Sequence, residues 1–164
     1  MARERSIEGP FWIAPHLAFL VQWLRVLGMD VRLWTGTEKS GPAGDRVVQW
    51  SRYPLALHGA EVLTLSSSIR EDLLKEFFSS LGIEPDRTRM FTRCLGCNSR
   101  LSPMTPEEVF RLWPEIPPYV YQTQPRFNWC PGCKKFYWAG THVRNMIRTL
   151  EEWGVIPRNP PETL

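Results

Sequence analysis

The chain has 164 residues, of which 43% are hydrophobic and 23% charged, a composition that is globular and excludes a disordered chain. No apolar run approaches the roughly 20 residues that a transmembrane helix needs, so we expect no membrane association. The net charge of +3 excludes a strongly acidic or basic protein, and residues 1–10 lack the apolar stretch of a secretion signal, so we predict a cytoplasmic location.

The first 34 residues have the pattern of a strand, a helix and a second strand. Phe11–Ala14 is a short apolar run typical of a buried strand, and Pro15 suits the first turn of a helix. Apolar residues then recur at helical spacing as far as Gly28, and Asp30–Trp34 alternates like a second strand. This order predicts a βαβ unit with parallel strands.

The next segment completes a small α/β domain. Residues 35–44 form a predicted loop, and Asp45 is expected to cap a short helix that ends before Pro54. A third strand is predicted at Glu61–Ser66, and a capping box of Ser68 and Glu71 predicts a helix over residues 69–81, closed by Gly82. We therefore expect a three-layer α/β domain with a parallel sheet over residues 1–85.

Residues 86–148 change to short strands around two cysteine pairs. A capping box at Thr105–Glu108 predicts a helix to about Trp113, after which three prolines predict an extended return to the second pair. A strand is expected over residues 136–138 and a closing helix over residues 141–153. Residues 149–164 would hold the end of that helix and a loose proline-rich tail.

The two cysteine pairs are Cys94-Leu-Gly-Cys97 and Cys130-Pro-Gly-Cys133, and they contain every cysteine of the chain. Two such pairs complete the tetrahedral four-thiolate shell of a structural zinc site. Two disulfides or a redox-active dithiol are the alternatives, and the absence of a secretion signal disfavours the first. The glycine before each second cysteine, Gly96 or Gly132, is expected to supply a positive φ.

Basic and aromatic residues interleave near the cysteines. Residues 86–150 carry ten Lys/Arg against four Asp/Glu, whereas residues 1–85 are close to neutral. Such a basic half favours RNA as partner, because contacts between cations and phosphates release counterions. A solvated basic surface and rings that only cover a small core are the plain alternatives. The candidate RNA-contacting residues are Arg93, Arg126, Lys134, Lys135, His142 and Arg144.

Several motifs carry a resemblance to a known family. They are Met90–Leu101 around the first pair, Phe127–Cys133 around the second, and Tyr137–His142 after it. With the proline-rich Ile116–Tyr121, they resemble the Mut-seven C-terminal RNase domain, a PIN-like nuclease fold that ends in a zinc ribbon. Trp23–Asp30 also resembles the first helix and second strand of that family. The resemblance implies a PIN-like α/β domain followed by a four-cysteine zinc ribbon.

The resemblance also implies a nuclease centre, which this chain departs from. PIN-type nucleases cut RNA with clustered carboxylates that hold one or two divalent ions. The family's acids after the first and third strands correspond here to Ala14 and Ser66, and only Asp45 matches as a residual catalytic acid. No Asp or Glu lies between Phe11 and Met29, so a shifted alignment does not restore the first acid.

Taken with the motifs, the resemblance predicts a protein that binds structural Zn²⁺ and RNA and has an inactive nuclease centre. Two alternatives stay open. One is an active ribonuclease that uses Mg²⁺ or Mn²⁺ with Asp45 and further acids. The other is a non-catalytic subunit that binds a protein partner. Whether the chain is an enzyme is therefore not decided by its sequence, although the two missing acids argue against catalysis.

Overall fold

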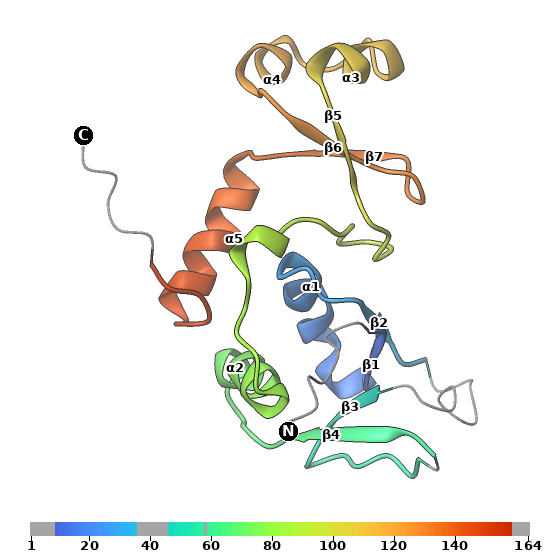
Figure 1. Ribbon diagram of the computed structural model, residues 1–164, viewed down its shortest axis with the longest axis vertical. Coiled ribbons are helices and arrows are strands. Elements are labelled where there is room, and N and C mark those ends of the chain that lie inside the picture. The colour runs from blue at the N-terminus through green and yellow to red at the C-terminus, as the bar shows by residue number, and fades with distance from the viewer. Residues whose placement is uncertain (1–8, 36–45, 58, 159–164) are drawn as a thin grey trace, which may run out of the picture. The chain divides into compact units, whose positions relative to one another are not determined.

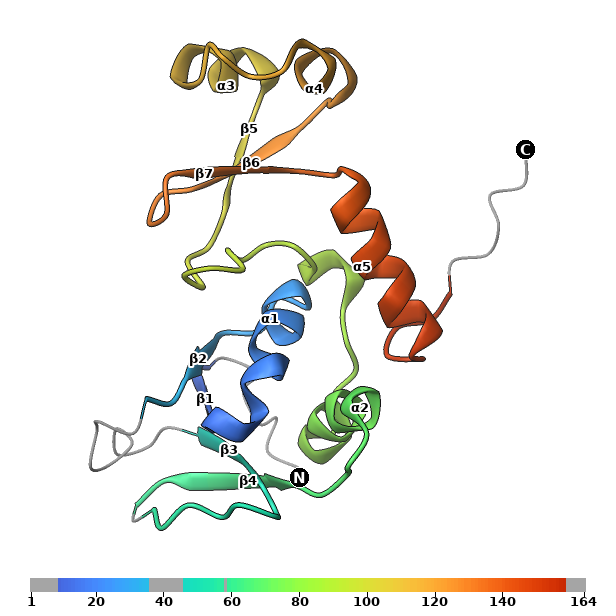
Figure 2. The same cartoon turned by 180° about the vertical axis from the view of Figure 1, so that it is seen from behind.

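The computed structural model of the protein describes residues 9–35, 46–57 and 59–158 (Figure 1). Its contacts divide the chain into two units, residues 1–98 and 99–164. The domain limits predicted from the sequence, at residues 85 and 148, follow changes in composition rather than contacts, and they stay a prediction. Figure 2 shows the same elements from behind.

Four parallel strands form the sheet of the first unit, in the order β2-β1-β3-β4. The parallel pairing of the first two strands confirms the predicted βαβ unit. Since all four strands run the same way, their carboxyl ends meet at one edge of the sheet, the usual place for sites in such folds. The strands are β1 (Phe11–Ile13), β2 (Val31–Leu33), β3 (Arg46–Trp50) and β4 (Glu61–Leu65).

Strand β3 replaces the short helix predicted after Asp45, and that prediction was wrong. The segment carries two adjacent β-branched residues, Val47 and Val48, which are both fully buried. A central strand of a parallel sheet is covered on both faces, so it reads as a continuous apolar run instead of an alternating one. The apparent helix cap and the following Pro54 therefore gave a false helix signal.

Two helices cover the sheet of the first unit, α1 (Ala18–Val26) and α2 (Arg70–Leu81), with the 3₁₀ turn η1 (Pro15–Leu17) leading into α1. The ring of Phe11 in β1 packs edge-on against Phe77 of α2, with 5.2 Å between ring centroids, and both rings are fully buried. The two helices also contact each other. Of the three predicted layers, the described residues thus supply the sheet and one helical layer.

The start of α2 differs from the predicted capping box. Ile69 is the N-cap, and no side chain caps the helix. The Ser67 hydroxyl instead accepts a hydrogen bond from the Ile69 N–H at 3.1 Å, so the serines form a local turn before the helix. The predicted end is confirmed, because Gly82 adopts the left-handed conformation at φ 66°.

Gly28, which ends α1, has a φ of +80°, and a Cβ at this position would lie 2.3 Å from the Arg89 carbonyl oxygen of the 3₁₀ turn η2 (Arg87–Arg89). Gly28→Ala should therefore combine a left-handed penalty of about 1–2 kcal/mol with a backbone clash. Gly82→Ala is the matched control, because its φ is also positive but no atom lies within 4 Å of the added Cβ. Urea unfolding should show at least twice the destabilisation for Gly28→Ala, and equal losses would contradict this packing.

The second unit contains an antiparallel sheet in the order β5-β6-β7 and two short helices, α3 and α4. Val109, Ile116 and Phe127 form its buried core, with half-buried aromatic rings packed around them. Figures 1 and 2 both show α3 and α4 side by side at one end of β5 and β6. The elements are β5 (Ser102–Met104), α3 (Pro106–Leu112), α4 (Pro118–Thr123), β6 (Phe127–Cys130) and β7 (Lys135–Trp138).

The predicted capping box at Thr105 and Glu108 is confirmed in both directions, and the closing helix is α5 (Thr141–Glu152). The extended return predicted after Pro114 was wrong, because α4 begins at Pro118. A proline at the first helical position loses no hydrogen bond and has a φ that suits the helix. The prolines thus start a helix here instead of preventing one.

Candidate functional site

Each cysteine pair forms a tight turn whose backbone N–H groups point at sulfur. The Cys97 N–H approaches the Cys94 Sγ at 3.5 Å, and the Cys133 N–H approaches the Cys130 Sγ at 3.3 Å. The second pair lies in the hairpin between β6, which ends at Cys130, and β7, which begins at Lys135. Such N–H donors stabilise negative charge on thiolates, which is the form that binds a metal.

The four sulfur atoms lie within 4.8 Å of one another, and the cysteines form no disulfide. Four thiolates at about 2.3 Å from a central zinc ion would be about 3.8 Å apart, so the arrangement suits a tetrahedral metal site. Cys94 and Cys130 are fully buried, whereas Cys97 is exposed. In the part of the chain that the structure describes, no other group of three or more His, Cys, Asp or Glu has this geometry.

The positive φ predicted at Gly96 and Gly132 was wrong. Neither glycine has a positive φ, and the residue after each second cysteine has one instead, Asn98 at 69° and Lys134 at 56°. The N–H of each of these residues donates to the carbonyl of the first cysteine, Cys94 or Cys130, at 2.9 Å. The turn therefore needs the left-handed conformation one residue later than the glycine, where asparagine tolerates it well.

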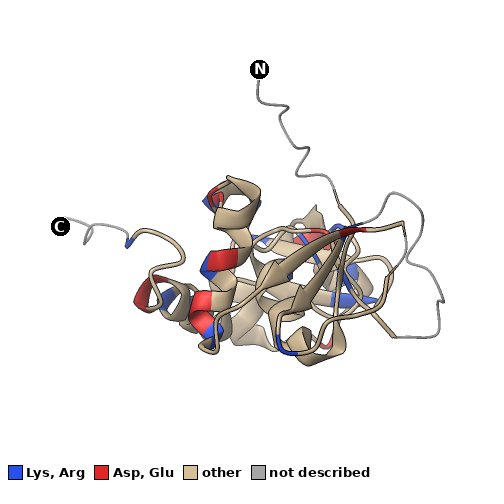
Figure 3. Ribbon diagram, turned by 90° about the horizontal axis from the view of Figure 1, so that it is seen from below, with Lys and Arg blue, Asp and Glu red and all other residues tan. Residues whose placement is uncertain are grey.

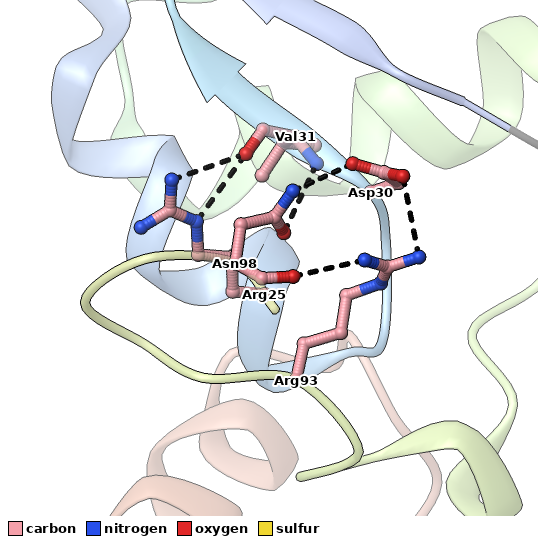
Figure 4. A network of polar contacts seen from close by, with 5 residues as sticks. All are labelled: Arg25, Asp30, Val31, Arg93 and Asn98. Atoms are coloured by element: carbon pink, nitrogen blue, oxygen red, sulfur yellow. Dashed lines mark hydrogen bonds and ion pairs between the residues drawn. The ribbon is translucent and has the colours of Figure 1, made fainter. Parts of the chain in front are cut away.

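A polar network attaches the first knuckle, residues 93–98, to the start of β2 (Figure 4). Asn98, only 6% exposed, donates from Nδ2 to the Asp30 carboxylate at 2.6 Å, and its Oδ1 accepts from the Val31 N–H at 3.4 Å. Arg93 forms an ion pair with Asp30 at 3.3 Å and donates to the Asn98 carbonyl at 2.9 Å. Sequence reasoning missed this network, because its members are almost 70 residues apart.

Arg25 of α1 holds the same knuckle from the other side. Its Nη1 donates to the Leu95 and Gly96 carbonyls at 2.8 Å each, while Nε and Nη2 donate to the Val31 carbonyl. Burial lowers the pKa of Arg25, and the nearby Cys94, Cys97 and Asp30 oppose that change. A guanidinium stays charged in proteins, so Arg25 supplies a fixed positive charge beside the first pair of thiolates.

The carboxyl edge of the parallel sheet carries Ala14 after β1 and Ser66 after β4. Ala14 is 1% exposed, and its N–H donates to the Val48 carbonyl at 2.9 Å. Asp30 and Glu61 lie at the opposite edge, before β2 and at the first position of β4. Asp45, the predicted residual acid, lies outside the described residues. Among the described strands, β1 and β4 thus end without the acids expected there.

One carboxylate does reach this edge, that of Glu76 on α2. It accepts hydrogen bonds from the Ser66 N–H at 2.9 Å, the Ser66 hydroxyl at 2.7 Å and the Ser67 N–H at 3.1 Å. Burial raises the pKa of Glu76, but these three hydrogen bonds outweigh burial and lower the net pKa. Sequence reasoning missed Glu76, since only the fold brings α2 to the end of β4.

Glu76→Gln should lower the free energy of unfolding at pH 7 by about 1 kcal/mol or less, because the amide would present N–H to one N–H donor. Because folding lowers the pKa of Glu76, its carboxylate stabilises the fold fully at pH values above the pKa of an unfolded glutamate, about 4.3. This stabilisation is lost as the pH falls through the pKa of Glu76 in the folded chain. The difference in free energy of unfolding between the variant and the wild type should therefore be smaller in urea melts at pH 3 than at pH 7. Glu71→Gln on the same helix is the control, and a difference independent of pH would contradict the assignment.

Aromatic and basic side chains lie close to the ends of β1 and β3. His16 stacks on Tyr53 with ring centroids 4.1 Å apart, and Tyr53 is half exposed. Arg52 lies over the Trp50 ring, whose Nε1 donates to the Ser67 carbonyl at 2.9 Å. These groups provide no cluster of oxygen ligands for a hard divalent ion.

The predicted RNA-contacting residues fall into two groups. Arg93 has a side chain only 11% exposed and is engaged by Asp30. The others are exposed and belong to residues 99–164, and Arg144 is oriented by bonds to the Ala139 carbonyl and the Thr141 hydroxyl. Figure 3 shows that Lys and Arg are interspersed with Asp and Glu along the ribbon. The exposed set is Arg126, Lys134, Lys135, His142 and Arg144.

The described helices include none with both the length and the apolar character that a membrane span requires.

The chain belongs to the Mut7-C RNAse domain family, whose sequence model matches residues 10–150. The match covers the strands of the parallel sheet and all four cysteines, and it confirms the resemblance found in the sequence motifs. No curated protein and no solved structure matches the chain.

Proposed function

We propose that the protein binds RNA through exposed cations of residues 99–164 and does not cleave it. The observation that carries the proposal is the pair of strand ends at Ala14 and Ser66, where the family's nuclease centre requires acids. Mg²⁺ dehydrates reluctantly and needs a near-octahedral shell of oxygen ligands. The Ala14 side chain offers no such ligand, and the Ser66 hydroxyl already donates to Glu76. Membership in an RNase domain family supports nucleic acid as the ligand.

Zinc is the metal that the four cysteines fit best, because a closed four-thiolate shell is a structural site with no open position for substrate. Its role here is to hold the first knuckle to the second knuckle, residues 130–135, which joins β6 to β7. The second knuckle carries Lys134 and Lys135, both exposed, directly after Cys133. A metal that fixes this hairpin also fixes the two cations, which supports a binding surface that depends on zinc but involves no chemistry at the metal.

An active ribonuclease is the second candidate, and Glu76 is the observation that favours it. Its carboxylate lies at the end of β4, close to where an acid is expected. Both of its oxygens already accept hydrogen bonds from Ser66 and Ser67, however, which leaves little capacity for a metal. Glu76 therefore supports a structural role at the sheet edge better than a catalytic one.

Salt dependence of RNA binding tests the proposal. Four phosphate contacts to single-stranded RNA would give a slope of log K against log salt of about −3. The variant Arg126→Ala/Lys135→Ala/Arg144→Ala should flatten that slope by about 2 and weaken binding. Arg32→Ala/Arg70→Ala/Lys75→Ala in the first unit removes the same charge and should leave the slope unchanged.

Equal losses in the two triple variants would contradict the assignment of the surface. Failure of the zinc-loaded protein to bind RNA would contradict the proposed function. RNA affinity that does not change with salt concentration would contradict it too. Either outcome would favour the remaining alternative, a subunit that binds a protein partner through an apolar interface.

A further inference from the structure

The second unit contains a groove of about 580 Å³ with aromatic walls. This volume lies within the range of about 300–1,000 Å³ typical of small-ligand sites. Its lining residues combine five half-buried rings, one leucine and two exposed lysines. They are Leu112, Trp113, Trp129, Lys134, Lys135, Phe136, Tyr137 and Trp138.

The rings of this aromatic groove pack against one another. Trp113 lies parallel to Phe136, with ring centroids 5.8 Å apart and an interplanar angle of 7°. Trp129 lies across the β6–β7 pair from Phe136, with centroids 4.6 Å apart. Trp113 and Phe136 also pack against the buried core, but Trp129 is not among the residues described as packed there. Trp129 is therefore a groove ring whose contact with a ligand would not compete with the core.

The charge at the mouth of the groove identifies the occupant. Lys134 Nζ lies 6.0 Å from the centroid of the Trp129 ring, and Lys135 follows it in the chain. An aromatic groove beside two ammonium groups complements a flat ring that carries a phosphate. We infer that the groove holds one unpaired RNA base, stacked on Trp129, with its phosphate at Lys134. This inference rests on the proposed RNA binding and identifies the site at which one base binds.

Trp129→Leu tests the stacking, because leucine keeps an apolar side chain at the position. Loss of one stacked base should lower the affinity for a ten-nucleotide adenosine RNA by about 5- to 150-fold. Affinity for an abasic ribose-phosphate oligomer of the same length should stay unchanged, since it presents the charges without bases. Tyr119→Leu is the matched control, because Tyr119 is a 76% exposed ring of the same unit outside the groove.

A second variant, Lys134→Gly, tests the phosphate contact without stressing the fold, because glycine accepts the φ of 56° at this position. For this variant, the slope of log K for RNA binding against log salt should become about 0.7 less steep, which is the effect of one lost phosphate contact. Zinc content should stay at the wild-type level in both variants, which shows that the hairpin is intact.

The outcomes separate the two proposals. Suppose that the wild-type protein binds RNA with a steep dependence on salt, but that Trp129→Leu weakens binding of both oligomers equally or of neither. That result would overturn the base site and leave the proposed function standing. Unchanged RNA affinity of Trp129→Leu together with binding of a proline-rich peptide at the wild-type groove would assign the groove to a protein ligand. A wild-type protein that binds neither oligomer would overturn both proposals.

Discussion

Replacing Cys94 or Cys130 with serine is expected to abolish zinc binding and to unfold the segment around the knuckles. Both side chains are fully buried, so a serine hydroxyl would have to replace a thiolate ligand where water has little access. Structural zinc contributes about 10–16 kcal/mol in small zinc-binding peptides, and this free energy is available only to the folded chain. Metal analysis and thermal melting with and without a chelator measure both effects.

Cys97→His serves as the control for removing a thiol. Cys97 is exposed, so an imidazole has room, and its nitrogen is an ordinary zinc ligand. We expect this variant to retain one zinc per chain with weaker affinity, whereas Cys94→Ser and Cys130→Ser retain none. Full zinc content with a normal melting temperature in either serine variant would disprove the metal centre.

Asp30→Ala is expected to have the second-largest effect, because it removes two partners at once. Arg93 would lose the counter-charge 3.3 Å away in a site where its side chain is 11% exposed, and the buried Asn98 would lose its acceptor. Breaking a fully buried pair by removing one partner costs about 3–5 kcal/mol, and exposed pairs cost about 1 kcal/mol or less. The Asp30 side chain is 26% exposed, so we expect an intermediate loss of about 1–3 kcal/mol. Since the network holds the first knuckle, zinc affinity should also fall by about 10- to 100-fold.

Asp72→Ala is the matched control for Asp30→Ala. Asp72 pairs with Lys75 at 2.8 Å on α2, but both side chains are more than 40% exposed. Exposed pairs of this kind contribute about 0.3–0.5 kcal/mol, so this variant should melt almost normally and keep its zinc affinity. Denaturant unfolding and competition with a zinc chelator measure the two quantities, and similar results for Asp30→Ala and Asp72→Ala would contradict the network.

Local patterns predicted the parts of the fold that local physics determines. The spacing of Cys94, Cys97, Cys130 and Cys133 predicted one cluster, and the alternation of strand and helix before Trp34 predicted the parallel pair. Strand β3 was not predicted, because a strand buried on both faces does not alternate between polar and apolar residues. The helix signals beside it were also stronger. Helix α4 was not predicted, because its prolines were interpreted as helix breakers, whereas a proline can also occupy the first position of a helix.

The candidate sites depended more on long-range contacts, which no local pattern contains. Glu76 reaches Ser66 from another element, and Asp30 meets Arg93 and Asn98 across more than 60 residues. Sequence reasoning placed Asp30 at the start of a strand, away from the carboxyl edge, and the structure agrees. It gave no signal of the carboxylate's partners, since these depend on how the first knuckle folds back on β2.

The most direct test of RNA binding without cleavage measures both activities in the same tubes. Zinc-loaded protein is incubated with end-labelled single-stranded and structured RNA in Mg²⁺, Mn²⁺ or EDTA, beside Asp45→Asn and Glu76→Gln. We expect intact RNA in every tube and a shifted band on a native gel. Metal-dependent cleavage that either variant abolishes would contradict this expectation, because the missing acids would then be supplied from elsewhere in the chain.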